Sequence, residues 1–411
     1  MSGAMMARAQ AKRSSESLLD LVVVGGCGRV GLPLALSFAA AGVRVGIYDI
    51  DREKLERVRG GQMPFREPGA SRLLHEVLPT GRLDFDCGPA ILARTTTVLI
   101  AIGTAIDEFM NSSSRIFDCL VDQLAPNLQD GALVILRSTV YPGTTDHVSA
   151  RLNAHGLTAA VAFCPERVAE GHALDEIRSL PQLIGGVTDS AFERASELFR
   201  RLNVEIIRSS AKEAELAKLF TNTWRYMKFA IANQFFQMAH RAGVDYTHVL
   251  NSIRHKYPRA ADLPGPGFAA GPRLFKDTMQ LATFSHDHFP MGHAAMLINE
   301  GLAGYIIETL DSRQRLAGRT LGILGMAYKS ECDDKRASLS YQLRKLARFK
   351  GAHVLCSDPY VADPTFLPHD DVMQMSDVLV IGAPHNLYQD LDIGSREIVD
   401  IWGITGRGIR V

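Results

Sequence analysis

The sequence predicts an α/β protein with two Rossmann-like parallel-sheet domains joined by a long central helix. Three observations support this fold class. A glycine-rich turn follows an apolar run near the start of the chain, at residues 26–31. A proline-free segment from Ala211 to His240 has apolar residues at helical spacing. A second series of apolar runs, each ending in small or polar residues, begins near Arg319.

The composition is that of a globular protein without a polyanionic partner. Its 411 residues suggest two or three domains. Lys plus Arg and Asp plus Glu both total 45, so the charge balance does not indicate a nucleic-acid or membrane partner. Apolar runs stay far below the ~20 residues of a membrane span. Residues 1–17 lack the apolar core of a signal peptide, so we expect a disordered tail on a cytoplasmic protein.

The six cysteines are scattered without a CxxC pair, so we expect free thiols and no metal site. Cys27 occupies a variable position of the glycine turn, which favours a structural interpretation over a redox one. His286 and His288 are two positions apart and cannot share one face of a helix, which argues against a metal pair.

The glycine turn has the spacing of a dinucleotide-binding site. Leu21–Val24 is a continuous apolar run, typical of a buried parallel strand, and Gly26, Gly28 and Gly31 then fit G-x-G-x-x-G. We expect Gly26 to make the tight turn and Gly28 to let a pyrophosphate approach the backbone. Gly31 is expected to let helix and strand pack closely.

The following segment completes the motif. A helix over 32–41 is expected to stop at Gly42, and a second strand over 43–48 is expected to end at Asp49. Asp49 lies where an acid binds ribose hydroxyls and repels a 2′-phosphate, which favours NAD over NADP. A purely structural βαβ unit is the alternative.

Polar residues follow three further apolar runs, which predict strands at 95–104, 131–139 and 159–166. Open α/β sheets bind ligands at the carboxyl ends of their strands. Thr104, Thr139 and Glu166 are therefore expected along one crevice, although the threonines could simply cap or turn the chain.

The helix over 211–240 is expected to end at Gly243, and a helix of this length often crosses a dimer. Lys218 and Asn222 are four positions apart and share a face, which either points into a site or is solvated. Further strands are predicted within 320–329, 351–360 and 376–385. Because Gly322 and Gly325 do not make the fingerprint, this unit holds a different nucleotide or is structural.

From about residue 20 to the last residue, the chain resembles the UDP-glucose/GDP-mannose dehydrogenase family. The resemblance is carried in order by GGCGRVGLPLALSFAAAG, YDID, GQMPFREPG, RSTVYPGTT, FCPERVAEG, AELAKLFTNTWRYMKFAIANQ and GMAYKSECDDKRAS. It implies a tail (1–17), an NAD-binding domain (18–208), a central helical dimerisation region with an active-site loop (209–312) and a UDP-binding domain (313–411). It also implies a homodimer through the central helix and oxidation of a sugar C6 alcohol to a carboxylate.

The resemblance assigns roles to individual residues. The residues expected to contact NAD are Gly26, Gly28, Gly31, Asp49, Lys54, Thr104, Thr139, Lys276 and Arg336. Those expected in catalysis are Glu166, Glu170, Lys218, Asn222, Arg273 and Asp277. Within this set, Lys218 and Asn222 would hold the sugar hydroxyls and the developing oxyanion. Substrate contacts are expected from Arg259, Phe268 and Lys329.

Arg273 stands where the family has its nucleophilic cysteine, four residues before Asp277. In the family, the thiolate adds to the C6 aldehyde, hydride loss gives a thioester, and water releases the acid. A guanidinium stays protonated and offers only donors, so it cannot act as this nucleophile. Arg273 is instead expected to bind an anionic group, to block the pocket, or to pair with Asp277.

These features predict an NAD-dependent oxidoreductase acting on a UDP-hexose or UDP-N-acetylhexosamine without the covalent thioester route. One alternative is a non-catalytic nucleotide-sugar-binding homologue. Others are a redox-neutral NAD-using epimerase or dehydratase, and slow full oxidation with water activated by Asp277 and Glu170. The PERV segment resembles the hexosamine branch of the family, whereas Glu170 matches the glucose branch, so the sugar stays open.

Overall fold

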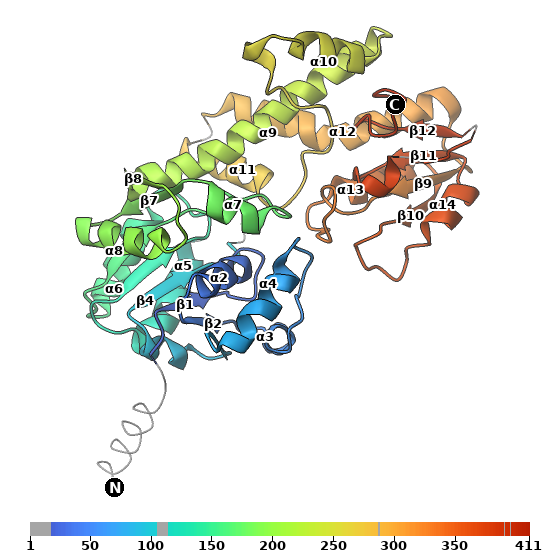
Figure 1. The fold of residues 1–411 in the computed structure, drawn as a ribbon. Helices are drawn as coiled ribbons and strands as arrows, with labels where there is room; N and C mark the ends of the chain where they lie inside the picture. The colour runs from blue at the N-terminus through green and yellow to red at the C-terminus, as the bar shows by residue number, and fades with distance from the viewer. Residues whose placement is uncertain (1–17, 105–113, 287, 390, 395) are drawn as a thin grey trace. The chain divides into compact units, whose positions relative to one another are not determined.

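The computed structural model describes residues 18–104, 114–286, 288–389, 391–394 and 396–411 (Figure 1). The expected tail at 1–17 lies outside the described residues. Packing divides the chain into two compact units, the first ending at Lys218 and the second running from Leu219 to Val411. Each unit has its own sheet, which confirms the predicted class of two parallel-sheet domains. The separate central region at 209–312 stays a prediction.

The first unit is built on an eight-stranded sheet with the order β3-β2-β1-β4-β5-β6-β7-β8. Its strands are β1 (Leu21–Val24), β2 (Val45–Tyr48), β3 (Leu83–Asp86), β4 (Thr97–Ile100), β5 (Leu133–Leu136), β6 (Ala160–Phe163), β7 (Gln182–Gly186) and β8 (Ile206–Ser210). All neighbouring strands are parallel except β6 and β7. The order reverses at β1, between β2 and β4, and such a switch point is where open sheets bind ligands.

Helices cover both faces of this sheet. They are α2 (Gly31–Ala40), α3 (Arg52–Arg59), α4 (Ala70–Val77), α5 (Ser114–Leu124), α6 (Thr144–Ala154), α7 (Ala173–Ser179) and α8 (Asp189–Arg200). Leu21 and Val23 of β1 join a core with side chains of α2, α7 and α8. Val22 and Val24 join another core with side chains of α5 and α6. Burial on both faces explains why β1 is a continuous apolar run.

The predicted strand Leu21–Val24 is confirmed with the same bounds, and the other predicted strands of this unit are confirmed with shorter bounds, because residues at their ends form loops. Three strands were missed. β3 has the sequence LDFD at the edge of the sheet, where charged residues interrupt the apolar pattern. β7 and β8 contain glycine, arginine and serine in place of an apolar run, so their composition gives little strand signal.

Helix α9 (Ala211–Arg241) confirms the prediction of one long helix and has 31 residues. At its start, the Ser210 N–H donates to Glu213 Oε2 at 2.8 Å and the Glu213 N–H donates to Ser210 Oγ at 3.3 Å. This reciprocal capping satisfies amides that would otherwise lack partners. The helix ends before Gly243, whose φ of 71° is left-handed.

The second unit contains a four-stranded parallel sheet with the order β10-β9-β11-β12. Its strands are β9 (Thr320–Leu324), β10 (His353–Ser357), β11 (Val378–Ile381) and β12 (Glu397–Val399). Its helices beyond α9 are α10 (Tyr246–Arg254), α11 (Leu274–Phe284), α12 (Pro290–Gln314), α13 (Leu339–Phe349) and α14 (His369–Met375). β9 lies between β10 and β11 as β1 lies between β2 and β4, which confirms a second Rossmann-like arrangement.

Candidate active site

The glycine turn between β1 and α2 depends on very close backbone approaches. Gly25 has a φ of 75°, and a Cβ there would lie 2.8 Å from the carbonyl oxygen of Ala101. A Cβ on Gly31 would lie 2.4 Å from the carbonyl oxygen of Gly25, which confirms the expected close packing. Gly26 lies within the tight turn, which the Gly28 N–H closes on the carbonyl oxygen of Gly25 at 3.1 Å, and Gly25 is its left-handed residue. Gly26 is needed for space, since a Cβ there would lie 2.8 Å from the Ile47 side chain.

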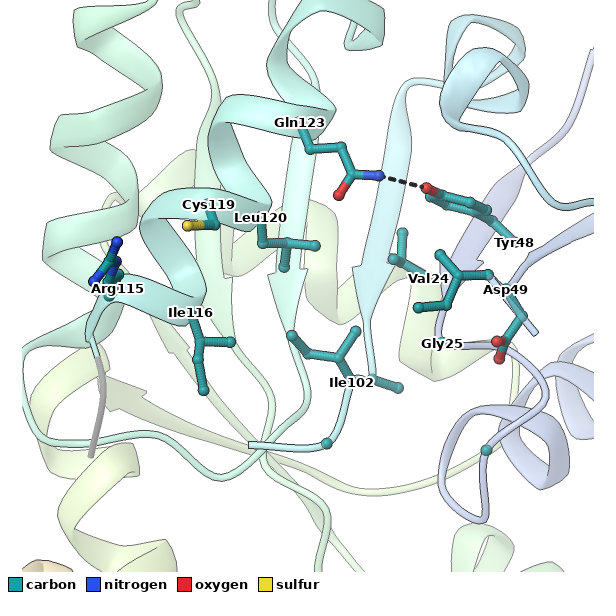
Figure 2. Close-up of a pocket in the computed structure, with 14 residues that line it drawn as sticks. Val24, Gly25, Tyr48, Asp49, Ile102, Arg115, Ile116, Cys119, Leu120 and Gln123 are labelled. Atoms are coloured by element: carbon teal, nitrogen blue, oxygen red, sulfur yellow. Dashed lines mark hydrogen bonds between the residues drawn. The ribbon is translucent and has the colours of Figure 1, made fainter. Parts of the chain in front are cut away.

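A cavity of about 670 Å³ lies at the carboxyl ends of β1, β2 and β4 (Figure 2). Its lining residues are Val24, Gly25, Gly28, Tyr48, Asp49, Ile50, Ala101, Ile102, Gly103, Arg115, Ile116, Cys119, Leu120 and Gln123. Figure 2 shows Asp49 on the side of the glycine turn, with Ile116, Leu120 and Gln123 of α5 across from it. A largely apolar cavity with one carboxylate beside a glycine turn suits a nucleotide, with an apolar wall for the base and an acceptor for the ribose.

The Asp49 carboxylate is already oriented by two backbone donors. Its Oδ2 accepts from the Cys27 N–H at 2.9 Å and its Oδ1 accepts from the Asp51 N–H at 3.0 Å. Each oxygen keeps a lone pair for a further donor, such as a ribose hydroxyl. Burial, and then the charges of Asp49 and Asp51, raise the pKa of the Cys27 thiol to about 12. Cys27 is therefore a neutral, buried thiol, in keeping with its structural interpretation.

Three further residues expected near NAD, namely Lys54, Thr104 and Thr139, lie in the same unit. Lys54 Nζ lies 2.6 Å from Asp51 Oδ2 on the half-exposed start of α3, and Lys54 is not in the lining of the cavity. Thr104 Oγ1 donates to the carbonyl oxygen of Thr139 at 2.9 Å. This bond joins the segments that follow β4 and β5, as expected from a shared crevice at the strand ends. The contacts of Lys54, Thr104 and Thr139 with NAD stay predictions.

Glu166 is held in a buried ion pair that the sequence did not reveal. Its Oε2 accepts from Nη2 of Arg137 at 3.0 Å and from Nε at 3.2 Å, and its Oε1 accepts from the Val168 N–H at 2.8 Å. Arg137 is 3% exposed and also donates to the carbonyl oxygens of Cys164 and Pro165. The sequence feature that could have indicated this ion pair is the position of Arg137, directly after a buried apolar strand. This network fixes the loop that follows β6.

The same loop is anchored again near Glu170, whose side chain is buried. Glu67 Oε2 accepts from the Gly171 N–H at 2.9 Å, and its Oε1 accepts from the Ala173 N–H at 2.8 Å. Glu67 belongs to the GQMPFREPG segment, so two segments that the sequence singled out separately are joined here. The loop that carries Glu170 is thus held on both sides.

A buried polar pair connects α9 with α11. Asn222 Nδ2 donates to Asp277 Oδ2 at 2.5 Å, across 55 positions of the chain. Asp277 is fully buried, and its Oδ1 has no hydrogen-bond partner within the described part of the chain. Lys218, one helical turn before Asn222, is 5% exposed. The alternative of a solvated helix face is therefore wrong for Lys218 and Asn222.

Two basic residues accompany Asp277 at the start of α11. Lys276 Nζ lies 4.0 Å from Asp277 Oδ1, and the lysine side chain is 14% exposed. Burial lowers the pKa of Lys276; the charge of Asp277 opposes this effect, and the charge of Arg273 adds to it. Arg273 is the N-cap residue of α11, and its carbonyl oxygen accepts from the Asp277 N–H at 2.9 Å.

The loop before α11 is fixed by a residue that the sequence did not single out. Asn233 Nδ2 donates to the carbonyl oxygen of Gly267 at 3.0 Å, and the Gly267 N–H donates back to Asn233 Oδ1 at 2.8 Å. Asn233 Nδ2 also donates to Asn299 Oδ1 at 2.9 Å. Phe268, expected to touch substrate, is 5% exposed and packs edge-on against Trp402 in the hydrophobic core. Its side chain therefore anchors the loop.

The remaining predicted residues also lie in the second unit. Arg336 Nη2 lies 2.5 Å from Oδ2 of the buried Asp334. Arg259 donates from Nε to Tyr257 Oη at 2.9 Å, and its guanidinium lies over the same ring at 4.5 Å from the centroid. Lys329 follows β9 and is partly buried. Their contacts with substrate or cofactor stay predictions.

Similarity to known sequences extends over most of the chain. The UDP-glucose/GDP-mannose dehydrogenase family matches with its NAD binding domain at residues 20–203, its central domain at 212–301 and its UDP binding domain at 322–406. A UDP-N-acetyl-D-mannosamine dehydrogenase of Pyrococcus horikoshii is 30% identical over 383 residues, covering 90% of this chain and 91% of that protein. The chain belongs to the UDP-glucose/GDP-mannose dehydrogenase family.

Solved structures of similar proteins support the same assignment. A UDP-glucose dehydrogenase of Pyrobaculum islandicum has a TM-score of 0.86 at 27% identity, covering 94% of both chains. The UDP-N-acetyl-D-mannosamine dehydrogenase of Pyrococcus horikoshii has a TM-score of 0.86 at 29% identity, covering 93% of this chain and 95% of that one. The cofactor of this dehydrogenase-like chain is NAD, and the glycine turn, the cavity and Asp49 fit it.

Among the described residues, no helix is both long and apolar enough to cross a membrane. The same residues contain no group of three or more His, Cys, Asp and Glu side chains arranged for a metal ion.

Proposed function

We propose that this family member is an NAD-dependent oxidoreductase acting on a UDP-sugar without a covalent thioester. The observation that carries the proposal is the buried Oδ1 of Asp277, which has no hydrogen-bond partner within the described residues and lies 4.0 Å from the Lys276 ammonium. A buried carboxylate oxygen without a hydrogen-bond donor costs free energy, so this oxygen supports a ligand that supplies one. A sugar hydroxyl or a water molecule has the required O–H group. The UDP binding domain of the family, matched at 322–406, supports a nucleotide-sugar substrate.

The roles of the residues follow from their chemistry. NAD, when bound, accepts a hydride from the carbinol carbon. Asp277 receives a hydrogen bond from the reacting hydroxyl or from a water, and Asn222 fixes its other oxygen. Lys218 supplies positive charge where an alkoxide develops. Glu166 acts by positioning, since both of its oxygens already accept hydrogen bonds.

The altered route rests on Arg273, because a protonated guanidinium has no lone pair for attack on an aldehyde. Oxidation therefore stops at the carbonyl compound. The sugar is a UDP-hexose or a UDP-N-acetylhexosamine, and the similar proteins from Pyrobaculum islandicum and Pyrococcus horikoshii represent both classes.

We also propose a homodimer through α9, because apolar side chains are exposed along one side of it. Phe220, Trp224, Ile231, Phe235 and Met238 are 53%, 52%, 41%, 42% and 58% exposed. Their spacings of three, four and seven residues place them on one stripe, which is an unfavourable surface unless another chain covers it. Light scattering during size exclusion should give a dimer for the wild type and a monomer for Phe235→Glu. A wild-type monomer would contradict the proposal.

The test of the activity compares Asp277→Asn with the wild type and with Asp371→Asn, a control on the exposed surface of the same unit. NADH absorbance is followed with UDP-glucose, UDP-glucuronate and the UDP-N-acetylhexosamines. We expect NADH formation by the wild type and the control. The rate of NADH formation should fall by about 100-fold or more in Asp277→Asn, because general acid–base catalysis typically contributes a factor of this size. Nucleotide-sugar binding without NADH formation by any of the three proteins would favour the non-catalytic alternative.

A further inference from the structure

We infer that the second unit has a separate anion-binding site, a cavity beside β12 that takes a small phosphate-bearing ligand. The cavity lies where the end of α12, the start of β12 and the last residues of the chain meet (Figure 1). Its volume of about 340 Å³ is at the lower end of the range of small-molecule sites, about 300–1,000 Å³. The charged residues of its lining are Arg313, Arg396, Glu397, Arg407 and Arg410.

The cavity is distant from the residues expected to bind the nucleotide sugar. Arg396 and Glu397 stand at the start of β12, and Arg313 lies at the end of α12, before β9 begins. Lys329, expected at the substrate, follows the end of β9. The strands of this sheet are parallel, so the start of β12 and the end of β9 lie at opposite edges of the sheet. Open sheets bind their usual ligand at the carboxyl edge, so a ligand in this cavity occupies a second site.

Arg313 is fixed at one wall of the cavity. Its guanidinium donates to the carbonyl oxygen of Val411 and to Nε2 of His240, the second at 2.9 Å. Burial lowers the pKa of His240, and the positive charges of Arg313 and Arg241 lower it further. The histidine therefore accepts this hydrogen bond as a neutral ring, and the same positive charges act on the space beside it.

The other three guanidinium groups are available to a ligand. In the part of the chain that the structure describes, the side chains of Arg396, Arg407 and Arg410 form no hydrogen bond or ion pair. Glu397, the acid of the lining, forms no ion pair with them there. All three arginines are exposed or half-buried, so a ligand can reach them. Guanidinium groups around one small space repel each other, and a bound anion relieves this repulsion.

The backbone that carries two of these arginines is held in place. The Ile409 N–H donates to Thr247 Oγ1 at 2.8 Å, which ties the segment to the start of α10. Arg410 and the fully buried Asp400 exchange two backbone hydrogen bonds of 3.0 Å. Side chains on a fixed backbone lose less conformational entropy when they bind a ligand, so this arrangement favours binding.

The number of guanidinium groups favours a phosphate over a carboxylate. A carboxylate has one charge and two oxygens, which a single guanidinium matches in a bidentate contact. A phosphate group has nearly two charges and three acceptor oxygens, so it contacts several guanidinium groups at once. The small volume favours a compact ligand such as pyrophosphate or a sugar phosphate.

The test is calorimetric titration of the full chain with inorganic pyrophosphate, and with citrate as a polycarboxylate for comparison. Arg396 also lines a neighbouring cavity, so the variants are Arg407→Gln and Arg410→Gln. Arg348→Gln, which removes an exposed charge from α13 of the same unit, is the matched control. Lys329→Gln removes the lysine expected at the substrate.

The wild type, Arg348→Gln and Lys329→Gln should bind pyrophosphate with similar affinity, and citrate more weakly. Arg407→Gln and Arg410→Gln should each lose at least about 10-fold in pyrophosphate affinity, as expected for a hydrogen bond between charged groups. Arg407→Lys keeps the charge without the planar fork, so it should lose less than Arg407→Gln.

Four results would overturn the inference. They are no binding of pyrophosphate to the wild type, binding that is unchanged in both Arg407→Gln and Arg410→Gln, citrate binding as tight as that of pyrophosphate, and loss of pyrophosphate binding in Lys329→Gln. The last would place the ligand at the predicted substrate site. None of them bears on the proposed activity, which is tested by NADH formation.

Discussion

The pair formed by Asn222 and Asp277 gives the sharpest prediction about the site. In Asn222→Ala, the buried carboxylate loses its 2.5 Å donor on Oδ2, and its Oδ1 already lacks one within the described residues. A hydrogen bond to a charged group contributes about 1.5–3 kcal/mol, so we expect a loss of about 2–3 kcal/mol in unfolding free energy. The lost stability should appear in the second unit, which contains both partners.

The assay is urea denaturation followed by tryptophan fluorescence. The chain has 2 tryptophans, Trp224 and Trp402, and both lie in the second unit, so the signal reports on it. A double-mutant cycle compares the wild type, Asn222→Ala, Asp277→Ala and the variant with both changes. The unfolding free energies should give a coupling energy between the two side chains of at least about 1.5 kcal/mol. Arg225→Ala, an exposed position on α9, should stay within about 0.5 kcal/mol of wild type. Effects of Asn222→Ala and Asp277→Ala that add within about 0.5 kcal/mol would refute the reasoning.

Three further predictions concern the first unit. Asp49→Ser should lower NAD affinity and raise the NADP-to-NAD affinity ratio in fluorescence titrations, because the acceptor for the ribose is lost; an unchanged ratio would contradict this. Gly31→Ala should lose NADH binding, since its Cβ would lie 2.4 Å from a carbonyl oxygen, whereas Gly301→Ala, with open space, should keep it. Cys27, with a pKa raised to about 12 by burial, should resist alkylation in the native protein from pH 7 to about 10, while the exposed Cys119 reacts; equal labelling would contradict this.

Most of the fold could be predicted from the sequence, because buried parallel strands and long helices leave strong local patterns. β1 is apolar at every position since helices cover both of its faces, and α9 is a proline-free helical pattern with a glycine after its end. The left-handed residue of the glycine turn, Gly25, was not singled out from the sequence. Two adjacent glycines, Gly25 and Gly26, carry the same local signal, and only the approach of Ala101 distinguishes them.

The contacts of the site join residues that are far apart in the sequence, which explains why the roles of Arg137 and Asn233 were not predicted. Arg137 meets Glu166 across 29 positions, and Asn233 meets Gly267 across 34. Neither arginine nor asparagine has a local pattern that shows its distant partner. The resemblance implies Phe268 at the substrate, and this stays a prediction; the structure shows that its ring is buried against Trp402.

We expect this family member to oxidise a nucleotide sugar without forming an acid. The most direct test incubates the wild-type protein with NAD and each UDP-sugar, and measures NADH together with product mass. The expected result is a product lighter by two hydrogens, with one NADH formed for each sugar converted. A product in which two hydrogens are replaced by one oxygen, with two NADH for each sugar, would contradict it.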